Sequence, residues 1–385
     1  MSEIILPKFM NIGGGKIKSV TDILKKINCE NPLIITDKTM VKLNIIEPLE
    51  RALTDLQIRY KIFDDTMPEP TAKSIENGVN ALKNGSFDCI IAFGGGSPID
   101  SAKAISLIAS QGGLIEDYKF PFINLDNNIP IIAIPTTAGT GSEVTKFTII
   151  TNEKTDEKML CVGPAFMPVA AIVDYELTYS VPKRTTADTA IDSLTHAIEA
   201  FVSKKSNLFS DTQAISAMKL IAPNIRRAYN NSKDQEAREK LMTGATLAGI
   251  AFSNSSVALV HGMSRPIGAF YHVPHGLSNA MLLPTVTEFS IPGSPDRYSK
   301  CAKAIGIANF DDNIEESNEK LLNELKKLNL DLEVPTIGEF GVKKETFFDN
   351  INTMATQAIA SGSPNNNPIV PSHDELVSLY KKLWN

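Results

Sequence analysis

Hydrophobic and polar positions follow one rhythm in the first 180 residues of the chain and another in the rest. The first part alternates short apolar runs with helical patterns, which is typical of an α/β domain with a parallel sheet. Four apolar runs predict strands, at residues 31–37, 88–93, 129–134 and 169–173, and the run at 88–93 leads into a helix expected over 101–110. The loops that follow these strands would meet at one sheet edge, where open α/β sheets bind ligands.

After residue 182 the strand-like runs give way to helical spacing, over 189–204, 211–229 and 234–251. Leu321, Leu322, Leu325 and Leu328 form one helical stripe, which we interpret as core packing. The sequence therefore predicts an α/β domain over residues 1–182 and an all-helical domain over 183–385. A cleft between two such domains is a natural place for a site.

Composition excludes several classes of protein. The apolar fraction of 43% and the charged fraction of 21% are those of an ordinary globular protein. The formal net charge of -6 comes with no basic arm or face, so we expect no nucleic-acid partner. No apolar segment approaches the ~20 residues of a membrane span, and the first residues, MSEIILPKFM, do not resemble a secretion signal. The four scattered cysteines form no CxxC pair and predict free thiols in the cytoplasm.

Four of the five histidines lie in the stretch 192–275, and three of them gather with an aspartate. Asp192 and His196 are four residues apart, so a helix would place them on one face. With His261 and His275 they form a candidate metal site. Three imidazoles and a carboxylate suit Fe²⁺, Zn²⁺, Mn²⁺ or Co²⁺, and the lack of a nearby cysteine favours a catalytic ion over a structural zinc. The alternatives are a helix-surface acid for Asp192 and helix-end residues for His261 and His275.

A glycine loop between the second predicted strand and its helix is a candidate phosphate site, with the residues Gly94, Gly95, Gly96, Ser97 and Asp100. Glycines let the backbone approach a ligand closely, and the free amides at a helix start attract a phosphate. The order differs from GxGxxG, and a tight structural turn is the alternative. Thr136, Thr137 and Thr140 could supply hydroxyls from the next loop, or simply form a Thr-rich turn.

Asp37 ends the first predicted strand and could accept hydrogen bonds from an adenosine ribose. A carboxylate there would repel a 2′-phosphate, which favours NAD(H) over its phosphorylated form. The alternative is that Asp37 is a turn or cap residue.

These motifs together resemble the iron-containing (group III) alcohol dehydrogenase family over essentially the whole chain. The matching segments are Gly94–Asp100, 135–140 with 142–145, 192–199, 261–263, 274–276 and the tail 362–368. The resemblance implies a Rossmann-like nucleotide-binding domain followed by a helical metal-binding and substrate domain. It also implies NAD(P) in the cleft, Fe²⁺ on the aspartate and three histidines, Lys158 near the cofactor, and homodimers or dimer-based assemblies.

Three residues are unusual for this family. Arg265 stands where a histidine is common, and an arginine cannot carry protons at neutral pH but can clamp an anion. We therefore hypothesise a short aldehyde with an anionic tail, although Arg265 could instead pair with a local acid. His272 stands where asparagine is frequent and could act as the proton carrier. Glu69 also replaces an asparagine, and its added negative charge favours NAD.

The predicted reaction is the metal-assisted, NAD(H)-dependent interconversion of a short primary alcohol and its aldehyde. A neutral substrate, as for lactaldehyde or 1,3-propanediol, is the first alternative. The same fold could also serve a glycerol-phosphate dehydrogenase or a dehydroquinate-synthase-like lyase. A nucleotide-binding regulatory protein without catalysis is the alternative of another class.

Overall fold

A computed structural model describes residues 3–125, 128–155 and 157–384. The chain forms two compact units, Glu3–Val181 and Pro182–Asn385. The first contains a parallel sheet with helices, and the second contains only helices among its described residues. The predicted fold class is confirmed.

The N-terminal unit is built on a six-stranded parallel sheet with the order β1-β8-β5-β4-β2-β3. Its strands are β1 (Phe9–Ile12), β2 (Pro32–Ile35), β3 (Lys61–Phe63), β4 (Cys89–Gly94), β5 (Ile131–Pro135) and β8 (Ala170–Val173). An antiparallel hairpin, β6 (Phe147–Asn152) and β7 (Glu157–Val162), forms a second sheet. Because all six strands run the same way, their carboxyl ends share one edge.

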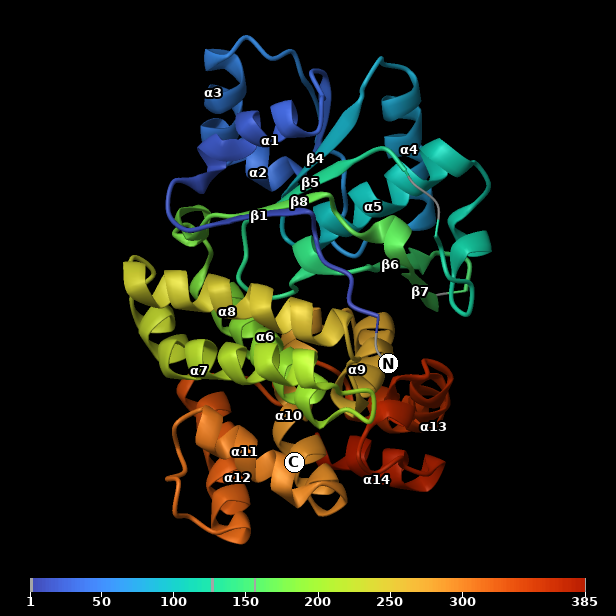
Figure 1. The fold of residues 1–385 in the computed structure, drawn as a ribbon. Coiled ribbons are helices and arrows are strands. Elements are labelled where there is room, and N and C mark those ends of the chain that lie inside the picture. The colour runs from blue at the N-terminus through green and yellow to red at the C-terminus, as the bar shows by residue number, and fades with distance from the viewer. Residues whose placement is uncertain (1–2, 126–127, 156, 385) are drawn as a thin grey trace. The chain divides into compact units, whose positions relative to one another are not determined.

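Helices cover both faces of this sheet (Figure 1). In β4, Ile90 and Ala92 pack towards α4 (Ala72–Lys83) and α5 (Gly96–Gln111). Ile91 and Phe93 point the other way, towards α1 (Val20–Lys26) and α3 (Glu47–Asp55). Burial on both faces explains why the central strands are continuous apolar runs in the sequence.

The four predicted strands are confirmed as β2, β4, β5 and β8, and the predicted helix over 101–110 lies within α5. The sequence analysis missed β1, β3 and the β6–β7 hairpin. Strands β1 and β3 form the two edges of the sheet and contain three or four partly exposed residues, so neither has the continuous apolar run of a central strand.

The C-terminal unit contains nine α-helices between its described residues. They are α6 (Lys183–Val202), α7 (Leu208–Asn230), α8 (Gln235–Ser253), α9 (Leu259–Tyr271), α10 (His275–Ser290), α11 (Pro295–Ala304), α12 (Ile314–Asp331), α13 (Lys344–Ala360) and α14 (His373–Lys382). Helix α6 packs against α7, α8 and α10, and α9 packs against α10 and α13. The helices predicted over 189–204, 211–229 and 234–251 correspond to α6, α7 and α8. No helix of the described chain combines the length and apolar character that a membrane crossing needs.

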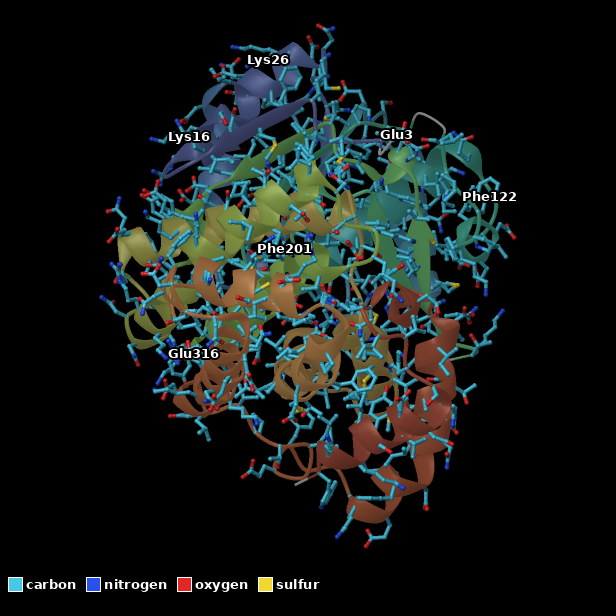
Figure 2. The ribbon with its side chains drawn as sticks, turned by 60° about the horizontal axis from the view of Figure 1, so that its bottom comes forward. Glu3, Lys16, Lys26, Phe122, Phe201 and Glu316 are labelled. Atoms are coloured by element: carbon cyan, nitrogen blue, oxygen red, sulfur yellow. The ribbon has the colours of Figure 1, made fainter. Side chains whose placement is uncertain are left out.

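Side chains fill the interior of the helical unit (Figure 2). Phe201, near the end of α6, is buried, and the guanidinium carbon of Arg297 lies 3.9 Å from the centre of its ring. In α12, Leu321, Leu325 and Leu328 are buried and pack into the core as predicted, whereas Leu322 is only half-buried.

Candidate functional site

Helix α6 carries the first two candidate ligands. It is buried along almost its whole length, and Asp192 and His196 lie one turn apart on one face. Asp192 is 2% exposed. The alternative of a helix-surface acid is therefore wrong.

The other two ligands come from the starts of two consecutive helices. His261 is the third residue of α9, and His275 is the first residue of α10. The positive end of a helix dipole disfavours a protonated imidazole at both positions. The alternative interpretation of His261 and His275 is that a helix dipole stabilises each as a cation at a helix end. A dipole does so only at a helix C-terminus, so this interpretation is wrong for both residues.

The four side chains converge on one point. The Asp192 Oδ1 atom lies 3.9 Å from His196 Nε2, 3.6 Å from His261 Nε2 and 3.9 Å from His275 Nε2. All four ligand atoms lie within 4.8 Å of one another. A tetrahedral ion with bonds of about 2.1 Å spaces its ligands by roughly 3.4 Å, so small side-chain movements would complete the site.

Burial and ring stacking disfavour more than one protonated imidazole at this point. The rings of His196 and His261 stack with 4.5 Å between their centres, and Phe252 stacks on His196 at 4.4 Å. Two protonated rings would repel each other in such a stack, whereas neutral rings present lone pairs to a cation. The side chain of His275 is 36% exposed, which leaves the ligand set accessible from one side.

Electrostatics keeps the aspartate ionised. Burial alone would raise the pKa of Asp192, but the three neighbouring imidazoles outweigh it and hold that pKa far below its usual range. Burial would likewise lower the pKa of His261, but the carboxylates of Glu199 and Asp192 raise it to about 9. The donor set thus provides one fixed negative charge and three imidazole nitrogens, which fits a divalent cation.

Two further buried residues contact the ligands, and the sequence analysis missed both as site residues. The Asn279 amide donates to Asp192 Oδ1 over 2.6 Å, and the Glu199 carboxylate accepts from His261 Nδ1 over 2.6 Å. Sequence spacing held a signal for both. Glu199 follows His196 by three residues, and Asn279 follows His275 by four, so each shares a helix face with a ligand.

The glycine loop and the threonine loop adjoin at the carboxyl ends of β4 and β5. Helix α5 begins at Gly96, and its N-cap residue, Gly95, has no side chain that could accept hydrogen bonds from the amides of the first turn. A methyl group added to Gly96 would meet Thr140 Cγ2 at 2.9 Å, and one added to Gly95 would lie 3.6 Å from Thr137 Oγ1. Gly94 has a φ of 145°, which an L-residue rarely adopts.

Several predicted cofactor residues have partners inside the fold. The Thr136 side chain is buried, and its hydroxyl contacts Met40 Sδ. The Asp100 carboxylate accepts hydrogen bonds from Ser142 Oγ and the Ile149 amide. These contacts favour structural roles, in which Asp100 ties the start of α5 to β6. Their roles as cofactor ligands stay predictions.

Asp37 is the N-cap of α2 (Lys38–Lys42), where its Oδ1 accepts from the Thr39 and Met40 amides. The alternative that Asp37 is a cap residue is thus correct for its Oδ1 atom. Contact with a ribose, which Oδ2 would have to make, stays a prediction.

Lys158, in β7, is 11% exposed and forms an ion pair with Glu69 over 2.8 Å. The Glu69 amide in turn donates to Ser97 Oγ over 3.3 Å, which connects this pair to the glycine loop. The positive charge of Lys158 offsets the negative charge of Glu69. Glu69 therefore adds little net negative charge, and the argument for NAD drawn from it loses its basis.

Arg265 and His272 lie on α9 and at its C-terminal end. Arg265 is mostly buried, and burial lowers its pKa. Within residues 3–125, 128–155 and 157–384 no acid forms a close ion pair with it, but the charge of the buried Glu199 carboxylate counteracts the effect of burial on its pKa, so pairing with a local acid stays an alternative. His272 is exposed and ends α9 with a φ of 53°. Its role as the proton carrier stays a prediction.

Comparison with known proteins identifies the family. The model of the Iron-containing alcohol dehydrogenase family matches residues 7–175, and that of the Fe-containing alcohol dehydrogenase family, C-terminal, matches residues 186–384. The chain belongs to the iron-containing alcohol dehydrogenase family. It is 32% identical to the lactaldehyde reductase of Escherichia coli K12, with full coverage of both chains.

Two solved structures of this family share the fold. A 1,3-propanediol oxidoreductase is 30% identical, with a TM-score of 0.94 and full coverage of both chains. A sulfoacetaldehyde reductase from Bifidobacterium kashiwanohense, in complex with NAD⁺, is 27% identical, with a TM-score of 0.88 and coverage of 100% and 99%.

Family membership decides between the classes of function left open by the sequence. This alcohol dehydrogenase is a metal-containing enzyme that works with a nicotinamide cofactor and interconverts alcohols and carbonyl compounds. The regulatory alternative is thereby wrong, and the comparisons favour a dehydrogenase over a lyase on the same fold.

Proposed function

We propose that this enzyme interconverts a short primary alcohol and its aldehyde with NAD(H) and a divalent ion held by Asp192, His196, His261 and His275. The observation that carries the proposal is the convergence of these four ligand atoms. The ion would act there as a Lewis acid on the substrate oxygen, and the nicotinamide would exchange a hydride with its carbon. Among the ions that suit the ligands we favour Fe²⁺, because the family description names iron.

The chain's own residues prepare this chemistry in two ways. Asp192, ionised and buried, supplies the charge that retains a cation, and Asn279 fixes the carboxylate rotamer by donating to Oδ1. The uncapped start of α5, with Gly95, Gly96 and Ser97, offers backbone amides to the cofactor's pyrophosphate.

A preference for NAD over its 2′-phosphorylated form rests on acidic residues that follow β2 and β3. Asp37 follows β2, while Asp64 and Asp65 follow β3, and Lys38 offsets one of these charges by pairing with Asp65 over 2.7 Å. Since β2 and β3 are adjacent, these carboxylates would repel a 2′-phosphate. The complex of a structural relative with NAD⁺ agrees with this preference.

Replacing Asp37 by serine tests the preference, because serine keeps an N-cap oxygen for α2 but removes the charge. We expect the ratio of kcat/KM for NADPH to that for NADH to rise by roughly tenfold or more, a change of ~1.4 kcal/mol. Steady-state kinetics with both cofactors measures it. An unchanged ratio, with the variant as stable as the wild type, would contradict the role of Asp37.

We further propose that the substrate carries an anionic tail that Arg265 binds. Arg265 lies four residues after the ligand His261 on α9, so one turn of helix separates the guanidinium from the metal ligands. Among the described residues its guanidinium forms no close ion pair, although the charge of Glu199 acts on it, so a carboxylate or sulfonate of the substrate would be its direct partner. A structural relative that reduces an aldehyde bearing a sulfonate supports this chemistry.

Replacing Arg265 by alanine should lower kcat/KM for an aldehyde with a carboxylate or sulfonate tail by about 10- to 150-fold, the loss of a hydrogen bond to a charged group. A neutral aldehyde of the same length should lose far less. Both substrates are measured with metal-loaded wild type and variant. Equal losses of kcat/KM for the two substrates would show that Arg265 does not bind an anionic tail, and the neutral alcohol would then be the favoured substrate.

A further inference from the structure

The Glu199 side chain has a set of contacts that links the start of α9 to one ligand. Glu199 is 3% exposed. Its Oε1 accepts from the Val260 amide over 2.6 Å, and its Oε2 accepts from the Ala258 amide over 2.9 Å and from His261 Nδ1 over 2.6 Å. A buried carboxylate is costly unless donors surround it, and here three donors do.

Two of these donors belong to the start of α9, which lacks a cap of its own. Ala258 stands at the N-cap position and has no side-chain oxygen to accept from the first amides. The Glu199 carboxylate, from α6, takes that place. A helix N-terminus also attracts a negative charge, so a carboxylate suits the position at the start of α9.

The third donor is His261 Nδ1, and its bond to Glu199 determines which nitrogen of the ring carries the proton. An ionised carboxylate can only accept, so the bond to Oε2 requires a proton on Nδ1 of the imidazole. A neutral His261 then has its lone pair on Nε2, the atom that lies 3.6 Å from Asp192 Oδ1. We infer that Glu199 is a positioning residue of the proposed metal centre, which couples the start of α9 to the metal-binding tautomer of His261.

His275 has a hydroxyl, not a carboxylate, beside its Nδ1 atom. Nδ1 lies 3.4 Å from Ser264 Oγ, and that hydroxyl also contacts Ser278 Oγ at 2.5 Å. A hydroxyl can donate or accept, so it does not specify a tautomer as a carboxylate does. The contact of His261 with a carboxylate therefore specifies its tautomer, whereas the contact of His275 with a hydroxyl does not.

Glu199→Gln is the most direct test, since it replaces one carboxylate oxygen by an NH2 group and keeps the shape. Glutamine has one accepting oxygen and one donating nitrogen, so it cannot accept from Ala258, Val260 and His261 together, and it removes the charge. We expect the dissociation constant for Zn²⁺ or Co²⁺, measured by competition with a chelator, to rise 10- to 100-fold. This readout does not depend on turnover.

The matched control is Asn207→Ala, which removes the side-chain cap of α7 in the same unit and contacts none of the four ligands. It should lower the melting temperature but leave the metal dissociation constant within about twofold, as expected for a cap that touches no ligand. If Glu199→Gln behaves like this control, Glu199 is only a helix cap and the inference is wrong.

If the glutamine variant does not fold, Glu199→Asp is the second variant that tests the inference. It keeps the charge but shortens the side chain by one carbon, so it should also weaken metal binding, although less. A wild-type metal affinity in a folded aspartate variant would overturn the inference. The inference rests on the proposed metal site, and the two can fail separately: wild-type protein that binds no metal in this assay would contradict the proposed function itself.

Discussion

Replacing His261 by alanine should remove both the bound metal and the activity of the enzyme. The imidazole supplies one of four ligand atoms, and its loss leaves Asp192 and two histidines around a cavity. Lewis-acid catalysis is worth several kcal/mol, so we expect kcat/KM for an aldehyde to fall on the order of 1000-fold or more. Metal content by mass spectrometry and NADH oxidation after anaerobic loading with Fe²⁺ measure the two effects.

His373→Ala is the control, since His373 begins α14 and contributes no atom to the ligand set. That variant should keep one metal per chain and wild-type activity. A His261→Ala enzyme that is free of metal yet fully active would show that the four residues do not serve catalysis.

Replacing Gly96 by valine should strongly weaken cofactor binding while the protein stays folded. The Cβ atom alone would come within 2.9 Å of Thr140 Cγ2, and the two added methyl groups would cover the amides at the start of α5. A displacement of about 1 Å at a binding loop can cost a factor of 10². We therefore expect the dissociation constant for NADH, measured by fluorescence titration, to rise about 100-fold.

Gly78→Ala separates cofactor loss from general packing damage in the same unit. Gly78 lies in α4, and a methyl group there would meet Ile105 Cδ1 on α5 at 2.1 Å. This variant should lower the melting temperature while NADH affinity stays near that of the wild type. If Gly96→Val binds NADH normally, the glycine loop is a structural turn and the cofactor site lies elsewhere.

The local elements of this fold could be predicted because their signals are local. Strands β2, β4, β5 and β8 are buried on both faces and appear as continuous apolar runs, and α6, α7 and α8 keep a helical spacing of apolar residues. Strands β1 and β3 pair on one side only, and their short, mixed sequences carry no such signal. The strand order depends on contacts between distant segments, which spacing does not encode.

The metal ligands could be predicted because their residue types are rare and their chemistry is specific. Their supporting residues could not, because a glutamate or an asparagine on a helix is common. Glu199 matters through the start of α9, about 60 residues later in the chain, and only folding brings the two together. The sequence likewise contained no sign that the Asp100 carboxylate would accept hydrogen bonds from Ser142 and Ile149, because these residues come close only after the intervening chain folds back.

The central claim is that one cation binds between a carboxylate and three imidazoles and activates the substrate oxygen. Anomalous diffraction at the iron edge, from crystals of the anaerobically loaded enzyme, tests it most directly. The account predicts a single peak surrounded by Asp192 Oδ1 and the Nε2 atoms of His196, His261 and His275. A loaded, active enzyme whose iron peak lies away from these four atoms would contradict it.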